Sequence, residues 1–236
     1  MNTSFQTGAV RAGLCAVAIV SLLGTGATLA AGLDSLTAAD ASGGLRAALG
    51  QGVDTAVAHL GTPGGFLSNP KVTIPLPAGL DKVDRALGML GMGGESDELK
   101  AAMNHAAEAA VAESKPILKH ALEHMSVADA KGILTGGDDA ATQYFRRTTA
   151  QSLAAKFKPI VASQTAKVKL AGLYDQYVGK AAQFGLVKES DANLDDYVTN
   201  KALDGLFLEI ADEERAIRTD PVGQASSLIK KVFSAL

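Results

Sequence analysis

Apolar side chains recur at helical spacing along most of the chain. Between Thr37 and Leu60 they follow one another at intervals of three and four residues, which places them on one face of a helix. The positions are Leu45, Leu49, Val53, Val57 and Leu60. Glycines interrupt this stretch and weaken the helix, but small residues there would also let another helix approach closely.

The longest and most regular pattern lies between Asp196 and Arg218, and it predicts a long helix. The positions expected to face inward are Val198, Ala202, Leu203, Leu206, Phe207, Ile210, Ala211 and Ile217. Shorter helical patterns cover residues 80–90, 95–114, 116–125, 126–136, 138–157 with a continuation beyond Pro159, and the stretch after Pro221. Strand patterns are almost absent. We therefore predict an all-α, single-domain bundle of about seven to nine helices over residues 31–236.

Residues 61–77 are the clear exception to the helical pattern. This stretch, G-T-P-G-G-F-L-S-N-P-K-V-T-I-P-L-P, holds four prolines and three glycines, which exclude a regular helix. Apolar residues alternate near its end, but the prolines there remove backbone donors, so any strand would be short and at an edge. We interpret the segment as an extended strap across the bundle. The alternative is the lip of a binding site.

A second interruption, at Gly136 and Gly137, brings a dense group of polar residues into an Ala-rich chain. Glycine suits the end of one helix, and Asp138 is expected to cap the next, because its carboxylate can accept the first backbone N–H groups. Phe145 would point to the core, and Arg146 or Arg147 could pair with Asp138, Asp139 or Asp204. We expect either a structural network of caps and ion pairs or the lining of a polar ligand pocket. The candidate ligand-binding residues are Asp138, Asp139, Tyr144, Arg146, Arg147, Lys201 and Asp204.

The first thirty residues have the order of a secretory signal peptide. A short region with Arg11 and no acid precedes an apolar run of about a dozen residues, and small residues follow up to Ala30. The apolar run is too short to span a bilayer comfortably, although a membrane anchor is the alternative. Cys15, the one cysteine, lies inside this run, so cleavage would leave a chain without a thiol. We expect a periplasmic or secreted protein that is not integral to the membrane after cleavage.

Composition narrows the functional classes. Removing residues 1–30 takes away one basic residue and no acid, which leaves 21 basic and 25 acidic residues and a net charge of −4. This balance argues against nucleic-acid binding, which needs a basic face. The chain contains none of the glycine-rich phosphate-binding loops or the G-x-S-x-G motif of hydrolases, and we expect no cofactor.

One motif could hold a metal. H-A-L-E-H at residues 120–124 has the H-x-x-E-H form of inverted zinc peptidases. His120 and His124 share a helix face and could bind one Zn²⁺, while Glu123 could act as a general base. A third ligand would be needed, and Glu108 or a carboxylate from residues 209–214 is of the right kind. The alternative is a solvated surface helix, in which this spacing arises easily.

Three stretches together resemble the bacterial DUF4197 family: N-P-K-V-T-I-P-L-P at 69–77, I-L-T-G-G-D-D-A-A-T-Q-Y-F-R-R-T-T at 133–149, and Y-V-T-N-K-A-L-D-G-L-F at 197–207. The resemblance covers essentially the whole chain after the first thirty residues. It implies an N-terminal export signal. It implies no activity, substrate or catalytic residue, because the function of the family is undefined.

These observations favour a non-enzymatic exported protein. Its partner would be an apolar or amphiphilic small molecule or an envelope protein, because an apolar helical bundle commonly holds such ligands. One alternative is a structural or assembly protein without a small ligand. The other is a zinc-dependent hydrolase that uses the motif at 120–124.

Overall fold

The fold is known from a computed structural model that describes residues 38–77, 94–168, 171–172, 174 and 193–219. The chain divides into two units, Met1–Ser35 and Leu36–Leu236, and all of the described residues belong to the second. The expected signal peptide and the helical patterns at 80–90 and after Pro221 lie outside the described residues.

The described part of the chain is all-helical, which confirms the predicted fold class. Its helices are α1 (Ala38–Leu60), α3 (Gly94–Ala112), α4 (Lys115–Glu123), α5 (Val127–Leu134), α6 (Ala140–Thr165) and α8 (Leu194–Thr219). No strand occurs in these ranges. None of these helices is both long enough and apolar enough to cross a membrane.

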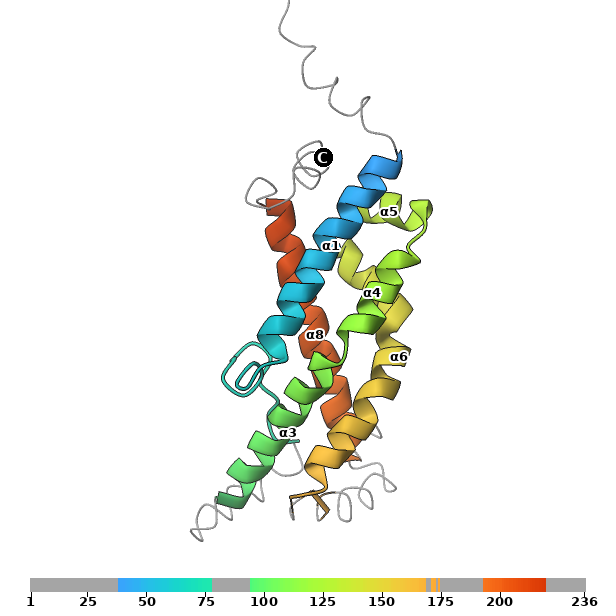
Figure 1. Cartoon of the computed structure of the whole chain (residues 1–236). Coiled ribbons are helices and arrows are strands. Elements are labelled where there is room, and N and C mark those ends of the chain that lie inside the picture. Colours follow the sequence, from blue (N-terminus) through green and yellow to red (C-terminus); the bar gives the residue numbers. More distant parts are fainter. Residues whose placement is uncertain (1–37, 78–93, 169–170, 173, 175–192, 220–236) are drawn as a thin grey trace, which may run out of the picture. The chain divides into compact units, whose positions relative to one another are not determined.

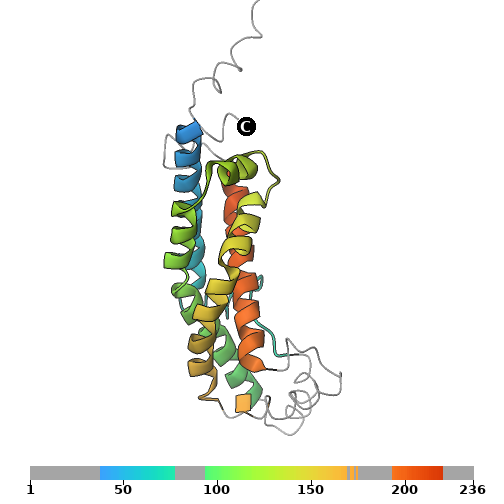
Figure 2. The same cartoon turned by 90° about the vertical axis from the view of Figure 1, so that its right-hand side faces the viewer.

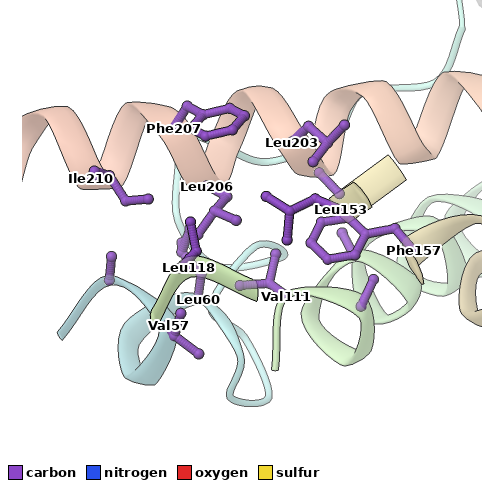
Figure 3. Packing of buried hydrophobic residues seen from close by; sticks show 14 of the residues in the cluster. Val57, Leu60, Val111, Leu118, Leu153, Phe157, Leu203, Leu206, Phe207 and Ile210 are labelled. Atoms are coloured by element: carbon purple, nitrogen blue, oxygen red, sulfur yellow. The ribbon is translucent and has the colours of Figure 1, made fainter. Parts of the chain in front are cut away.

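Helix α8 packs against α6, α1 and α3, and α1 also packs against α4 and α5 (Figures 1 and 2). Every apolar position that the sequence placed inward on α1 is buried. The same is true of α8 except for Ala211, which is half-buried. Figure 3 shows how side chains from α1, α3, α4, α6 and α8 meet in one core; the labelled residues are Val57, Leu60, Val111, Leu118, Leu153, Phe157, Leu203, Leu206, Phe207 and Ile210.

The helix boundaries follow local signals. Pro116 opens α4 directly after α3 ends, as expected for a proline in a first helical turn. Ser126 and Asp129 form a reciprocal capping box at the start of α5, in which the Asp129 N–H donates to Ser126 Oγ over 3.0 Å. Two hydrogen bonds from Ser126 lower the pKa of the Asp129 carboxyl. Pro159 does not end α6, which runs on to Thr165.

Residues 61–77 are non-helical but differ from the extended strap that the sequence suggested. The backbone turns repeatedly up to about residue 72, with Gly64 in the left-handed region at φ +85°, and only residues 73–77 lack turns. Phe66 and Ile74 are nevertheless buried. The Phe66 ring lies so close to α8 that a Cβ built on Gly205 would come within 2.6 Å of it. Gly205 is therefore the position that allows this segment to pack on α8.

We predict that Gly205→Ala destabilises the protein. The added methyl group meets a fully buried ring, and overpacking of this kind costs about 1–3 kcal/mol, against a gain of roughly 0.5–1 kcal/mol in helix propensity. The expected net loss is about 1–2 kcal/mol in the free energy of unfolding, measured by urea denaturation. Gly132→Ala in α5 is the control, because nothing lies within 4 Å of the place that a Cβ would occupy there, and it should be neutral or stabilising. Equal stability of the two variants would contradict the close packing of Phe66 on α8.

Candidate functional site

The polar residues predicted around the break at 136–137 lie in several different surroundings. Asp138 and Asp139 are exposed in the turn before α6. The Asp139 carboxylate accepts a hydrogen bond from Gln143 Nε2 at 3.0 Å, and its side chain makes no capping bond to the helix. No hydrogen bond or ion pair of Asp138 occurs within the described ranges. The expected cap by Asp138 is therefore not formed.

Tyr144 faces the interior. Its hydroxyl donates to the Ala121 carbonyl of α4 at 2.7 Å, and burial raises the pKa of this phenol. Arg147 lies beside it, with its guanidinium carbon 5.7 Å from the centre of the Tyr144 ring. Arg147 also forms an ion pair with Asp129 over 3.6 Å. Tyr144 and Arg147 are therefore neighbours, but the tyrosine hydroxyl points to the neighbouring helix and already has an acceptor there.

Arg146 takes part in a different group, between α6 and α8. It lies 3.4 Å from the Asp204 carboxylate, as the sequence allowed, and its guanidinium carbon lies 4.7 Å from the centre of the Phe207 ring. Lys201 lies over the Tyr197 ring at 5.8 Å. Arg146, Lys201 and Asp204 are all exposed, and exposed ion pairs of this kind contribute little to stability.

The seven candidate residues thus fall into an α5–α6 group, an α6–α8 group and an exposed turn. The two arginines are adjacent on α6, so they leave the helix in different directions and find different partners. Ligand binding by these residues stays a prediction. Of the alternative, a structural network of caps and ion pairs, the Arg146–Asp204 pair is present and the cap by Asp138 is not.

The start of α6 is capped from a distant part of the chain. Glu214 of α8 is 97% buried, and its two carboxylate oxygens accept the backbone N–H groups of Ala141 and Thr142, each at 2.9 Å. Arg218, four residues on, donates to the same carboxylate at 2.8 Å and to the Ile133 carbonyl at 2.9 Å. Glu214 and Arg218 thus form a pair that joins α5, α6 and α8.

A second buried carboxylate holds residues 61–77. One oxygen of Glu108, on α3, accepts the backbone N–H groups of Gly64, Phe66 and Leu67 at 3.0–3.1 Å. Its other oxygen lies 2.8 Å from His105 Nδ1. One turn earlier on α3, Asn104 accepts from the Ile74 N–H at 2.8 Å and donates to the Ile74 carbonyl at 3.0 Å.

These anchors were missed by reasoning from the sequence. The available signal was a glutamate within an Ala-rich inward face, together with a loop of glycines and prolines whose backbone groups needed partners. Glu108 was considered only as a possible third zinc ligand. Its hydrogen bonds to three backbone N–H groups and its contact with His105 assign it a structural role instead.

The histidine motif at 120–124 lies at the end of α4. His120, Glu123 and His124 are exposed, and one ligand atom from each lies within 4.8 Å of the others. His124 Nδ1 is 2.9 Å from the His120 carbonyl, so its other ring nitrogen remains available. The spacing suits metal capture, but full exposure does not provide the enclosed, dry site that zinc hydrolases use. Hydrolysis by these residues stays a prediction.

A shallow depression follows the outward face of α1. Its lining residues recur every three to four positions and are mostly small: Ala47, Gly50, Gln51, Asp54, Thr55, Ala58 and His59. On one side Asp54 binds Lys115 and Lys119 of α4 at 2.8 and 3.3 Å, and the hydrogen bond from Lys115 lowers the pKa of the Asp54 carboxyl. We call this surface the α1 groove. The sequence indicated the small residues but not the face they would share.

Comparison with known proteins supports the resemblance drawn from the three sequence stretches. The model of the family described as "Protein of unknown function (DUF4197)" matches residues 35–234, which is most of the chain. No curated protein and no solved structure matches the chain.

We predict that Glu214→Ala lowers the free energy of unfolding by about 2–4 kcal/mol. The substitution leaves two helix N–H groups without their side-chain acceptor and takes from the half-buried Arg218 its carboxylate partner, so that only the Ile133 carbonyl remains. Losses of this kind are large in buried positions. Glu214→Gln keeps one acceptor oxygen and should lose less. Chemical denaturation of the three proteins measures the difference.

Asp139→Ala is the matched control for this cap, because Asp139 occupies the position before α6 without capping it. We expect a change within about 0.5 kcal/mol, as for other exposed substitutions. A larger loss of unfolding free energy for Asp139→Ala than for Glu214→Ala would show that the local aspartate, and not Glu214, caps α6.

Proposed function

We propose that this chain, which belongs to the DUF4197 family, is an exported, non-enzymatic protein that binds a helix of an envelope protein in the α1 groove. The proposal includes a cleaved signal peptide at residues 1–30 and a periplasmic location. It also includes a total of seven to nine helices for the whole chain. Residues 61–77, although turned rather than extended up to about residue 72, would act as a strap across the bundle. The α1 groove is the observation that carries the binding function.

The interior offers less support for a buried ligand. Large side chains from several helices, among them Phe66, Phe145, Phe157 and Phe207, are fully or almost fully buried and pack into one core. Small-molecule sites enclose most of their ligand. The α1 groove is open and shallow, so a ligand would lie along it and keep one side in solvent.

The shape and charge of the groove fit an amphipathic helix. Its floor is built from small residues such as Ala47, Gly50 and Ala58, which allow a second helix to approach closely. Lysines of α4 border one side through Asp54, and Glu209 of α8 borders the other through His59 at 3.1 Å. A partner helix with a narrow apolar face, acidic residues along one edge and basic residues along the other would complement this surface in one orientation.

Exposure of the candidate catalytic groups argues against an enzyme. The histidine motif and the Arg146–Asp204 pair both lie in solvent, where charges interact weakly. A cleaved chain would also have no cysteine nucleophile. The expected absence of a cofactor remains a prediction.

A photoreactive amino acid placed at Ala47 or Ala58 should cross-link a discrete partner in living cells. Ala216 on α8 is also exposed and serves as the matched control, at which no such adduct is expected. Mass spectrometry identifies the adduct, and binding to the purified partner is then measured with the parent protein and with Ala47→Arg. We expect the substitution to weaken binding at least about tenfold, or 1.4 kcal/mol.

The outcomes separate the competing functions. Equal labelling at all three positions, or unchanged affinity of Ala47→Arg, would contradict the α1 groove as the binding surface. An adduct with a second copy of this chain would instead indicate an assembly protein. Native mass spectrometry could instead show a small amphiphile bound to the parent protein and absent from Ala47→Arg. That result would indicate that the groove binds a small molecule and not a protein.

A further inference from the structure

A cluster of metal-ligating side chains lies at one end of the α1 groove, where α1 and α8 meet. His59 belongs to the last turn of α1, and Glu209 and Glu213 lie one turn apart on α8. One ligand atom from each residue lies within 4.8 Å of the other two. The cluster joins positions about 150 residues apart and is distinct from the histidine motif on α4.

The two glutamates of this cluster are partly buried, whereas the His59 side chain is 59% exposed. The side chain of Glu209 is 13% exposed and lies 3.1 Å from His59 Nδ1. Glu213 is half-buried, and no hydrogen bond or ion pair of its carboxylate occurs in the ranges that the structure describes. Burial is the main cause of a raised pKa of Glu213; His59 acts in the opposite direction, and Glu209 and Asp212 add to the rise.

The neighbouring cationic side chains pair with a different carboxylate, that of Asp212. Lys71, from the 61–77 segment, and Arg215 of α8 both bind Asp212, each at 2.8 Å. The hydrogen bond to Asp212 is the main cause of the raised pKa of Lys71, and the charge of Glu209 adds to the rise. Two carboxylates and an imidazole are thus left facing one another around the end of α1, where the helix dipole favours positive charge.

We propose that His59, Glu209 and Glu213 bind one divalent transition-metal ion, with Zn²⁺ as the best match. One imidazole nitrogen and two carboxylate oxygens form an N/O donor set that suits Zn²⁺, and water or a partner group can complete the coordination. Zinc ligands lie about 2.0–2.2 Å from the ion, which places them roughly 3.3–3.6 Å apart in a tetrahedral site. In the metal-free protein the three ligand atoms lie within 4.8 Å of one another, so binding would draw them together. The ion would neutralise the two carboxylates and tie α1 to α8.

Metal binding is tested on the full chain carrying His120→Ala and His124→Ala, which removes the exposed histidine motif. Titration calorimetry with Zn²⁺ should show one ion per chain, Zn²⁺ should raise the Tm, and Co²⁺ should give the visible absorption of a four-coordinate site. His59→Ala, Glu209→Gln and Glu213→Gln should each weaken binding at least about tenfold. Asp204→Asn, on the exposed side of the same helix α8, should leave binding unchanged.

The metal site and the proposed partner can fail separately. Ala47 lies at the end of the α1 groove that is far from His59. The substitution Ala47→Arg should therefore abolish partner cross-linking and leave Zn²⁺ affinity unchanged. Absence of stoichiometric Zn²⁺ binding, or equal affinity of Glu213→Gln and its parent, would overturn the metal site whatever the cross-linking result. Binding that persists in His59→Ala with unchanged Co²⁺ absorption would do the same.

Discussion

Two buried carboxylates that accept backbone N–H groups hold the described helices and the 61–77 segment together. Glu108 binds three N–H groups of a non-helical segment, and Glu214 binds the first N–H groups of α6. Hydrogen bonds to charged groups contribute about 1.5–3 kcal/mol each, whereas an unsatisfied buried partner costs a similar amount. The two glutamates therefore fix where the 61–77 segment and the α5–α6 turn can lie, and apolar packing on α8 fills the space between.

Local patterns were sufficient to predict much of this fold. The apolar positions of α1 and α8 are almost all buried. Apolar side chains that recur every three to four residues lie on one face of a helix, and packing that face against other helices removes it from water. The capping box of Ser126 and Asp129 is a local feature of the same kind, since both partners lie within one turn. Where the determinants are close in sequence, the pattern and the structure agree.

The candidate site was harder to predict, because its geometry depends on distant partners. Asp138 and Asp139 had the sequence of a cap, but Glu214 of α8 takes that place. Tyr144, Arg146 and Arg147 are neighbours in sequence, yet they contact α4, α8 and α5 respectively. The approach of His59 to Glu209 and Glu213 likewise depends on how α1 crosses α8. At Gly52 the two helices lie at contact distance, since a Cβ built there would lie 3.4 Å from Glu213 Cβ.

The cap on α6 has a consequence for motion. Helix ends normally fray, because their first amide groups have no partner within the helix and open readily to solvent. In α6 the amides of Ala141 and Thr142 are instead tied to a carboxylate that Arg218 also holds, and Arg218 reaches back to the carbonyl of Ile133. The exposed turn between α5 and α6 is thus clamped on both sides, so thermal opening of this region should require α8 to move as well.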